Sequence, residues 1–275
     1  VAVFQGSSAP TVAENKALVV KFAQDAADAG ARMCVFPELF LAGYDIGQEN
    51  LRKLAVLKDG EEMKELAEAA KQIGIALVVP YGEKDHSDAY YNSAALIAHT
   101  GELVLNYRKC HLFGDYEQGV FTPGDSLPVV NLPGLNILVG ILICFDIEFP
   151  EAARVLRLKG AELIIVPTAL PIGPLAEVTP LATIPCRALE NHAFLCYSNH
   201  AAQQGVDERA LGSIAFSGYC GRSAIVGPNG MDLARASSGF EGLLLADIDT
   251  KKYDPDVLRN PYIQIRRPEL YHELC

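Results

Sequence analysis

The sequence lacks several features that would associate it with a membrane or with nucleic acid. Its 275 residues contain no uninterrupted apolar run of about 18 residues, so we expect no transmembrane helix. Basic residues are scarce, with 23 Lys and Arg against 34 Asp and Glu, and the net charge is −11. Because the phosphates of nucleic acids and anionic lipids attract basic surfaces, this balance argues against both as partners. Half of the residues are hydrophobic, which is typical of a globular protein.

The chain also lacks the spacings that bind metals or build a disulfide framework. Its seven cysteines are odd in number and scattered, without a CxxC pair, and there is no HExxH motif. Cys110 and His111 are adjacent, so on a strand they would point to opposite faces and form a poor chelate. We therefore predict no metal site, and free thiols in a reducing compartment, the cytoplasm. Residues 1–5 lack the basic start of a signal peptide and are expected to form a first strand.

No Ser/Gly-rich linker, charge block or short repeat divides the chain. We therefore predict a single domain over residues 1–275. From about residue 251 the sequence is polar and irregular, with three prolines and with Tyr253, Tyr262 and Tyr271. We expect this C-terminal tail to wrap a partner subunit, with disorder as the alternative.

Strands and helices alternate along most of the chain, and two hairpins interrupt the alternation. Helices are expected from a capping box at Thr11 to near Gly30, over 61–73, from Pro150, and over 181–191. Single strands are expected at 31–36, 75–79, 137–143, 163–166, 193–198 and 243–248, and hairpins at 91–98 with 102–107 and at 223–226 with 232–236. This mixture predicts mixed sheets with helices on the outside.

Cys144 is the most informative residue. It follows the continuous apolar run 137–143, which has the length of a buried strand, and it precedes a helix start at Pro150. A thiol between a strand end and a helix N-terminus lies where the helix dipole and free N–H groups favour the thiolate, so Cys144 is a candidate nucleophile. The alternative is a small buried hydrophobic residue, the common role of cysteine.

Two charged residues also follow predicted strands directly. Glu38 comes at the end of the apolar segment 32–37, and Lys109 comes at the end of the strand-like segment 102–108. In open α/β sheets, groups at the carboxyl ends of strands converge in one crevice. We therefore expect Glu38, Lys109 and Cys144 to share a site.

Taken together, these segments resemble the nitrilase superfamily of carbon–nitrogen hydrolases. The resemblance rests on residues 36–44, 107–113 and 143–151, with support from 116–117, 187–191 and 227–230. It implies a four-layer αββα sandwich of two mixed sheets. It also implies a Glu38–Lys109–Cys144 triad that hydrolyses an amide-like C–N bond without a metal or cofactor. Homodimers or larger homo-oligomers, assembled through helices near the site and through the C-terminal tail, are implied as well.

The chemistry of these side chains suggests their roles. Cys144 would attack the carbonyl carbon, Glu38 would accept the thiol proton and return it to the leaving amine, and Lys109 with the backbone N–H of Phe145 would stabilise the oxyanion. Because a carboxylate is normally too weak a base for a thiol, either burial raises the pKa of Glu38 or the helix terminus lowers that of Cys144. Glu117 matches a second family glutamate that orients the substrate or Lys109; the alternative is a solvated loop charge.

The substrate is suggested by Glu148, four residues after the candidate nucleophile. The resemblance places a pocket-lining side chain here, and relatives that bind carboxylates tend to have arginine. An acidic residue would repel a substrate carboxylate and favour an amine. Alternatively, Glu148 points away and pairs with Arg154 or another base.

The second indication is the Pro-rich stretch 166–174, which lacks the tryptophan found in the corresponding loop of many relatives. The predicted pocket is mostly apolar with one acidic corner. It is expected to be lined by Tyr44, Phe145, Ala169 and Leu170. We therefore predict a small or medium amide as the substrate, rather than an acidic N-carbamoyl amino acid.

Several alternatives remain open from the sequence. The triad does not distinguish amides from nitriles or from N-carbamoyl amines, and acyl transfer to an amine would need only the exclusion of water. A papain-like Cys–His pair is a further alternative, although no signature of that class is present. A catalytically inactive binding or regulatory protein on the same fold is the alternative of a different class.

Overall fold

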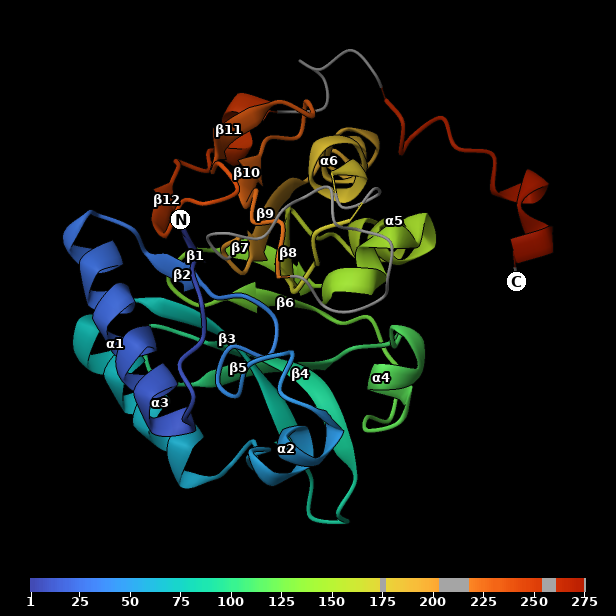
Figure 1. Cartoon of the computed structure of the whole chain (residues 1–275). Helices are drawn as coiled ribbons and strands as arrows, with labels where there is room; N and C mark the ends of the chain where they lie inside the picture. The colour runs from blue at the N-terminus through green and yellow to red at the C-terminus, as the bar shows by residue number, and fades with distance from the viewer. Residues whose placement is uncertain (174–176, 203–217, 254–260, 275) are drawn as a thin grey trace.

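The computed structural model describes residues 1–173, 177–202, 218–253 and 261–274. In these parts of the chain, two six-stranded sheets are flanked by helices (Figure 1). The first sheet has the order β12-β1-β2-β3-β4-β5, and the second has the order β11-β10-β9-β8-β7-β6. In each sheet the three parallel strands are β1–β2–β3 or β7–β8–β9, and the other pairings are antiparallel. The predicted four-layer αββα sandwich of two mixed sheets is confirmed.

The strands of the first sheet are β1 (Ala2–Gln5), β2 (Met33–Val35), β3 (Ala76–Lys84), β4 (Tyr90–Ile97), β5 (Leu103–Arg108) and β12 (Gly242–Leu245). Those of the second are β6 (Val129–Leu132), β7 (Ile137–Ile141), β8 (Leu163–Thr168), β9 (Phe194–Asn199), β10 (Ala224–Val226) and β11 (Asp232–Arg235). The longer helices are α1 (Val12–Asp28), α3 (Glu61–Ile73), α5 (Pro150–Leu158) and α6 (Ile184–Asn191).

The alternation of side chains along each strand creates the four layers. Val35 and Val78 belong to a large apolar core that they share with residues of the second sheet and of α5 and α6. Their neighbours Cys34 and Leu77 belong to a second core, which α1 and α3 cover. Successive strand residues point to opposite faces, so β2 and β3 each contribute to both cores. All four of these side chains are buried, which explains why the strands are continuous apolar runs.

Local signals place the helix ends. Thr11 caps α1: its hydroxyl accepts the N–H of Glu14, and the Glu14 carboxylate accepts the N–H of Thr11, both at 3.2 Å. Gly74 ends α3 in the left-handed conformation, with φ of 79°, which glycine adopts without steric cost. The predicted start of α5 at Pro150 is also observed.

The predicted helix over 181–191 differs at its start. Residues Thr179–Thr183 form a π-helical turn, and regular α-helix begins only at Ile184. Pro185 lacks an N–H and cannot make the i→i−4 bond of an α-helix, which explains the wider turn. Strand β3 runs five residues beyond the prediction, from 79 to Lys84, because its end pairs with β4.

Three short elements are absent from the sequence prediction: α2 (Gln48–Lys53), α4 (Gly114–Gln118) and strand β6. Each is too short to show a period. The C-terminal tail is described at 251–253, which belong to the 3-10 turn η3 (Thr250–Tyr253), and at 261–274. The second segment is irregular apart from the 3-10 turns η4 (Pro268–Leu270) and η5 (His272–Leu274), and it leads away from the sheets (Figure 1). Pro255 of the tail lies outside the described residues. Within the described residues, no helix is long and apolar enough to cross a bilayer.

Candidate active site

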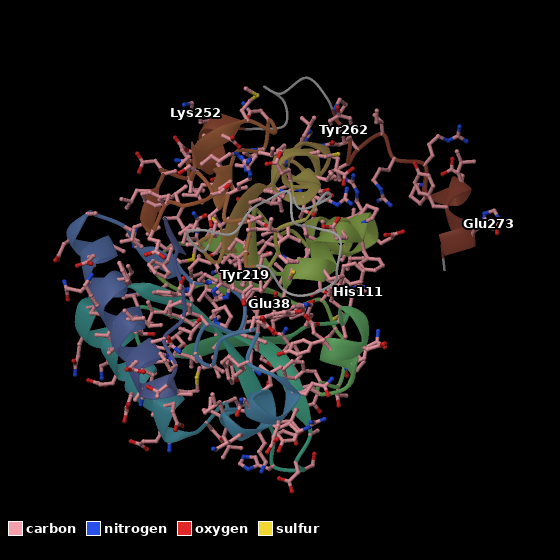
Figure 2. The ribbon with its side chains drawn as sticks, in the orientation of Figure 1. Glu38, His111, Tyr219, Lys252, Tyr262 and Glu273 are labelled. Atoms are coloured by element: carbon pink, nitrogen blue, oxygen red, sulfur yellow. The ribbon has the colours of Figure 1, made fainter. Side chains whose placement is uncertain are left out.

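The ends of three strands bring Glu38, Lys109 and Cys144 toward one place between the sheets. Glu38 follows β2, Lys109 follows β5, and Cys144 follows β7 as the first residue of the 3-10 turn η1 (Cys144–Glu148). Glu38 is labelled in Figure 2 where the two halves of the ribbon meet. Glu38 and Lys109 are both buried, and an ion pair of 2.7 Å joins them.

The backbone of Glu38 is anchored to the second sheet. Its N–H donates to the carbonyl of Thr168 at the end of β8, and its carbonyl accepts from Nε2 of His200 at 2.8 Å. His200 is buried, and burial lowers its pKa to about 4, so it is a neutral donor near pH 7. Because Glu38 follows β2 of the first sheet and its backbone is bonded to the second sheet, both sheets fix its position.

The two carboxylate oxygens of Glu38 have different surroundings. Oε1 accepts from Lys109 Nζ and from Asn92 Nδ2, each at 2.7 Å. Oε2 is buried and has no hydrogen-bond partner among the described residues. Burial raises the pKa of Glu38 to about 7, against the opposing effect of Lys109. One oxygen is therefore fixed, while the other can exchange a proton near neutral pH.

Lys109 lies between two carboxylates. Besides Glu38, its Nζ donates to Oε1 of Glu117 at 2.6 Å, and the same oxygen accepts the hydroxyl of Tyr44 at 2.7 Å. Oε2 of Glu117 accepts the N–H of Phe113 at 2.9 Å. Burial alone would lower the pKa of Lys109, but the two carboxylates raise it. Lys109 is therefore an ammonium, and Glu117 is a buried member of the network rather than a solvated loop charge.

Cys144 occupies a strained turn, with a left-handed φ of 48°. Burial raises the pKa of its thiol well above the usual value, the Glu38 carboxylate raises it further, and Lys109 opposes both. The backbone of Ala169 also opposes the rise of this pKa. Cys144 therefore interacts electrostatically with both Glu38 and Lys109.

The expectation that a helix terminus favours the Cys144 thiolate is wrong, since the pKa is raised. Helix α5 begins only at Pro150, beyond the turn η1. Helix dipole effects fall off within the first turn, so they do not offset the burial of the sulfur. Of the two ways to reconcile a carboxylate base with a thiol, the structure favours a raised pKa of Glu38.

Phe145 and Glu148 continue the turn that Cys144 begins. The Phe145 ring packs edge-on against Phe113 and Phe149, with centroids 5.3 and 5.1 Å away. Oε1 of Glu148 accepts a hydrogen bond from Thr179 of the π-helical turn. Within the described residues Glu148 forms no ion pair with Arg154. The alternative in which these two residues pair is therefore wrong.

Tyr197 of β9 is a buried residue that both Cys144 and Glu148 influence. Burial raises the pKa of Tyr197, and the nearby groups Cys220, Cys144 and Glu148 raise it further. The candidate nucleophile and Glu148 therefore both act electrostatically on this one buried hydroxyl.

Ala169 and Leu170 follow β8. Ala169 is buried and packs with Tyr44 in a small apolar cluster. Leu170 is half-buried, and its N–H donates to Oδ1 of Asn199 at 3.0 Å. Pro174, the last residue of this loop in the prediction, lies outside the described residues.

Sequence reasoning missed Asn92 and Asp146, which contact the triad or its turn. Both are polar residues that the fold buries completely. Asn92 and its neighbour Ser93 are the polar residues of an otherwise apolar and aromatic strand, which is the signal that could have identified Asn92. His200 was not singled out either, although it bonds the backbone of Glu38.

The histidines do not support a Cys–His pair. His200 bonds the Glu38 backbone, and His111 bonds Asp146. Among the described residues, no hydrogen bond joins a histidine to Cys144, and no group of three or more His, Cys, Asp or Glu side chains could hold a metal.

Known proteins resemble this chain over its full length. A hydrolase encoded in the pqqF 5' region of Pseudomonas protegens is 39% identical, and the match covers 100% of this chain and 91% of the relative. Omega-amidase NIT2 of Xenopus tropicalis is 32% identical, covering 95% of this chain and 92% of the relative.

Solved structures also resemble this chain over its full length. An amidase from Nesterenkonia sp. AN1 superposes with a TM-score of 0.79 at 30% identity, covering 100% of this chain and 98% of that one. A mutant of that amidase has been solved with the acetamide moiety of fluoroacetamide added covalently at its active-site cysteine. The family model of the carbon-nitrogen hydrolases matches residues 1–255. The chain therefore belongs to the carbon–nitrogen hydrolase family, within the nitrilase superfamily.

Proposed function

We propose that this protein is a thiol amidohydrolase that cleaves the C–N bond of a small amide through a thioester on Cys144. The observation that carries the proposal is the asymmetry of Glu38. One of its oxygens is fixed by Lys109 and Asn92, while the other is buried without a described partner, and the Glu38 carboxylate acts electrostatically on the Cys144 thiol. The covalent adduct on the cysteine of the Nesterenkonia amidase supports a sulfur nucleophile at the corresponding step.

The first half of the reaction forms the thioester. Oε2 of Glu38 accepts the thiol proton as the sulfur attacks the carbonyl carbon. An ammonium has three N–H donors, and Glu38 and Glu117 accept two of those of Lys109. The third donor, with the backbone N–H of Phe145, stabilises the oxyanion. Protonated Glu38 then gives its proton to the leaving nitrogen, and the C–N bond breaks.

The second half releases the acid. Glu38, ionised again, removes a proton from water as the water oxygen attacks the thioester carbon. The tetrahedral intermediate collapses, the C–S bond breaks, and the proton on Glu38 returns to the sulfur. A carboxyl with a pKa of about 7 can both accept and donate the proton at neutral pH, as this sequence requires.

Glu117 and Tyr44 hold Lys109 in place rather than react. Glu117 accepts from Lys109, Tyr44 and the Phe113 backbone, so its carboxylate is fixed by three donors. We assign Tyr44 this supporting role in addition to the predicted role in lining the pocket.

For the substrate we propose a small or medium amide whose acyl part can contact Phe145 and the Ala169–Leu170 segment, with Glu148 favouring an amine over a carboxylate. Glu148 is held by Thr179, and its charge acts on the same buried Tyr197 hydroxyl as Cys144, which supports its facing the pocket. A nitrile substrate remains the second candidate because a relative from Pyrococcus abyssi, 35% identical over 86% of this chain, is named a nitrilase.

The test is ammonia release by the purified protein from a simple aliphatic amide, an amino amide, the matching nitrile and an N-carbamoyl amino acid. We expect kcat/KM to be highest for the two amides. Cys144→Ala should lower kcat by about 10⁴-fold or more with the fold intact, because it removes the nucleophile. Wild-type-like activity in this variant would contradict the assignment, and a strong preference for the carbamoyl compound would contradict the proposed pocket.

We also propose that the protein is cytoplasmic and forms a homodimer or a larger homo-oligomer. The six described cysteines are all free, which supports a reducing compartment. The tail exposes Ile265, Leu270 and Tyr271, with 67%, 58% and 41% of their surface accessible, which supports burial against a second copy.

A further inference from the structure

We propose that Asp146 is a positioning residue that fixes the turn bearing Cys144 against the strand end bearing Lys109. The proposal rests on the amidohydrolase function above and adds a residue that does not touch the reacting atoms. Asp146 lies two positions after Cys144 and is completely buried.

Four donors converge on the Asp146 carboxylate. Oδ1 accepts the backbone N–H of His111 at 2.8 Å and its ring Nδ1–H at 2.7 Å. Oδ2 accepts the hydroxyl of Tyr107 at 2.7 Å and the backbone N–H of Ile143 at 2.9 Å. Hydrogen bonds to an ionised carboxylate are about twice as strong as neutral ones. These four bonds therefore hold His111, Tyr107 and Ile143 firmly against Asp146.

One of these bonds and a backbone bond of Asp146 bracket the nucleophile. The Asp146 side chain accepts the N–H of Ile143, and the Asp146 backbone N–H donates to the carbonyl of Ile143 at 3.0 Å. Cys144 lies inside this loop with its φ of 48°. A left-handed conformation is unfavourable for a residue with a Cβ, so it persists only where the surroundings impose it. The bonds between Asp146 and Ile143 are the surroundings that impose it here.

The other bonds reach the first sheet. Tyr107 is the next-to-last residue of β5, and His111 follows Lys109 by two positions. The His111 ring also stacks on Phe149, just after η1, with centroids 4.0 Å apart and planes at 15°. Asp146 therefore sets the distance between the segments that present Lys109 and Cys144. An error of about 1 Å in such a distance can lower the rate a hundredfold.

The test compares Asp146→Asn with Glu83→Gln. Asparagine has one acceptor oxygen, so two of the four donors would face its NH2 group, and either the Ile143 bond or the His111 bonds are lost. Glu83 is a matched control. It is also a completely buried carboxylate, and it is bonded by Ser93, Asn106 and Arg108 away from the nucleophile turn.

Two quantities are measured at a temperature at which circular dichroism shows both variants folded. They are kcat and KM for a simple amide, and the rate at which chloroacetamide alkylates Cys144, followed by peptide mass spectrometry. We expect Asp146→Asn to lower kcat and the alkylation rate by about tenfold to a hundredfold, with KM changed less than about threefold. Glu83→Gln should lower the melting temperature but leave both rates near wild type.

Equal rates in Asp146→Asn and wild type would overturn the proposal, as would equal losses in both variants. If Asp146→Asn does not fold, Tyr107→Phe decides, because it removes one bond and keeps that to Ile143. A fall of about twofold to tenfold in kcat supports the positioning role, and an unchanged kcat and alkylation rate overturns it. Should the wild-type protein release no ammonia, the proposed function fails, whereas the alkylation rates still test Asp146.

Discussion

Glu38 combines complete burial with a pKa raised to about 7, and this combination predicts the pH dependence of activity. Below pH 7 Glu38 is protonated and cannot accept the thiol proton. Above pH 7 it is ionised, while Cys144, whose pKa is raised, still holds its proton. We therefore expect kcat/KM to rise with pH through about 7 and then level off, in a pH–rate profile on a simple amide. A profile flat from pH 5 to 8 would contradict Glu38 as the base.

Substitution of Asn92 gives a more specific test of Glu38 as the base. Its Nδ2 donates to Oε1 of Glu38, and this bond lowers the pKa of the carboxyl. Asn92→Ala should therefore raise that pKa, and the acid limb of the kcat/KM profile should move to higher pH. Asn106→Ala is the control, because Asn106 donates to Glu83 instead. An unmoved limb in Asn92→Ala, or the same shift in the control, would argue against the predicted role.

Among the helices and strands, α5 packs closely on β7, and the turn that bears Cys144 lies between these two elements in the chain. A Cβ added at Gly140 of β7 would lie 2.8 Å from the side chain of Leu156 on α5, a distance that real Cβ atoms do not show. Leu156 is completely buried, so it has little room to move. Glycine at this strand position therefore allows the helix that follows the Cys144 turn to pack directly on the strand that precedes it.

The capping box of α1 affects stability without affecting chemistry. Thr11→Ala removes the hydroxyl that accepts the N–H of Glu14, so we expect the free energy of unfolding to fall by about 1 kcal/mol in urea denaturation. Because α1 covers the outer face of the first sheet, kcat should not change. Thr11→Ser keeps the acceptor and should retain most of the stability. Equal losses in the two variants would show that the cap is not the cause.

For the molecule as a whole, the exposed apolar side chains of the C-terminal tail predict assembly with a second copy. Tyr262 and Glu273 mark its course away from the sheets in Figure 2, and its apolar side chains have little cover from the described residues of the same chain. Ile265→Glu with Leu270→Glu should lower the mass measured by light scattering after size exclusion, because charges would then oppose burial against a second copy.

Met231→Glu is the matched control for this prediction. Met231 is 65% exposed, in the turn between β10 and β11 and outside the tail. We expect this variant to keep the wild-type mass. A wild-type protein that is already monomeric, or a control that also dissociates, would contradict assembly through the tail.

The fold class could be predicted because its causes are local. Buried strands such as 137–143 and 163–166 read as apolar runs, and Thr11, Gly74 and Pro150 set helix ends through bonds to residues nearby in the chain. The family could be predicted as well, since its motifs are short segments. The π-helical turn before α6 and strand β6 could not, because they depend on packing or on a few residues without a period.

By itself, the sequence determined that Glu38, Lys109 and Cys144 follow strands and that these strands belong to a carbon–nitrogen hydrolase. Only the tertiary structure decided which oxygen of Glu38 is fixed, that the thiol pKa is raised, and that Asn92 and Asp146 support the site. The reason is physical. Strand ends are set by neighbours in the chain, whereas pKa values and hydrogen-bond partners are set by burial and by groups such as Asn92, 54 positions from Glu38.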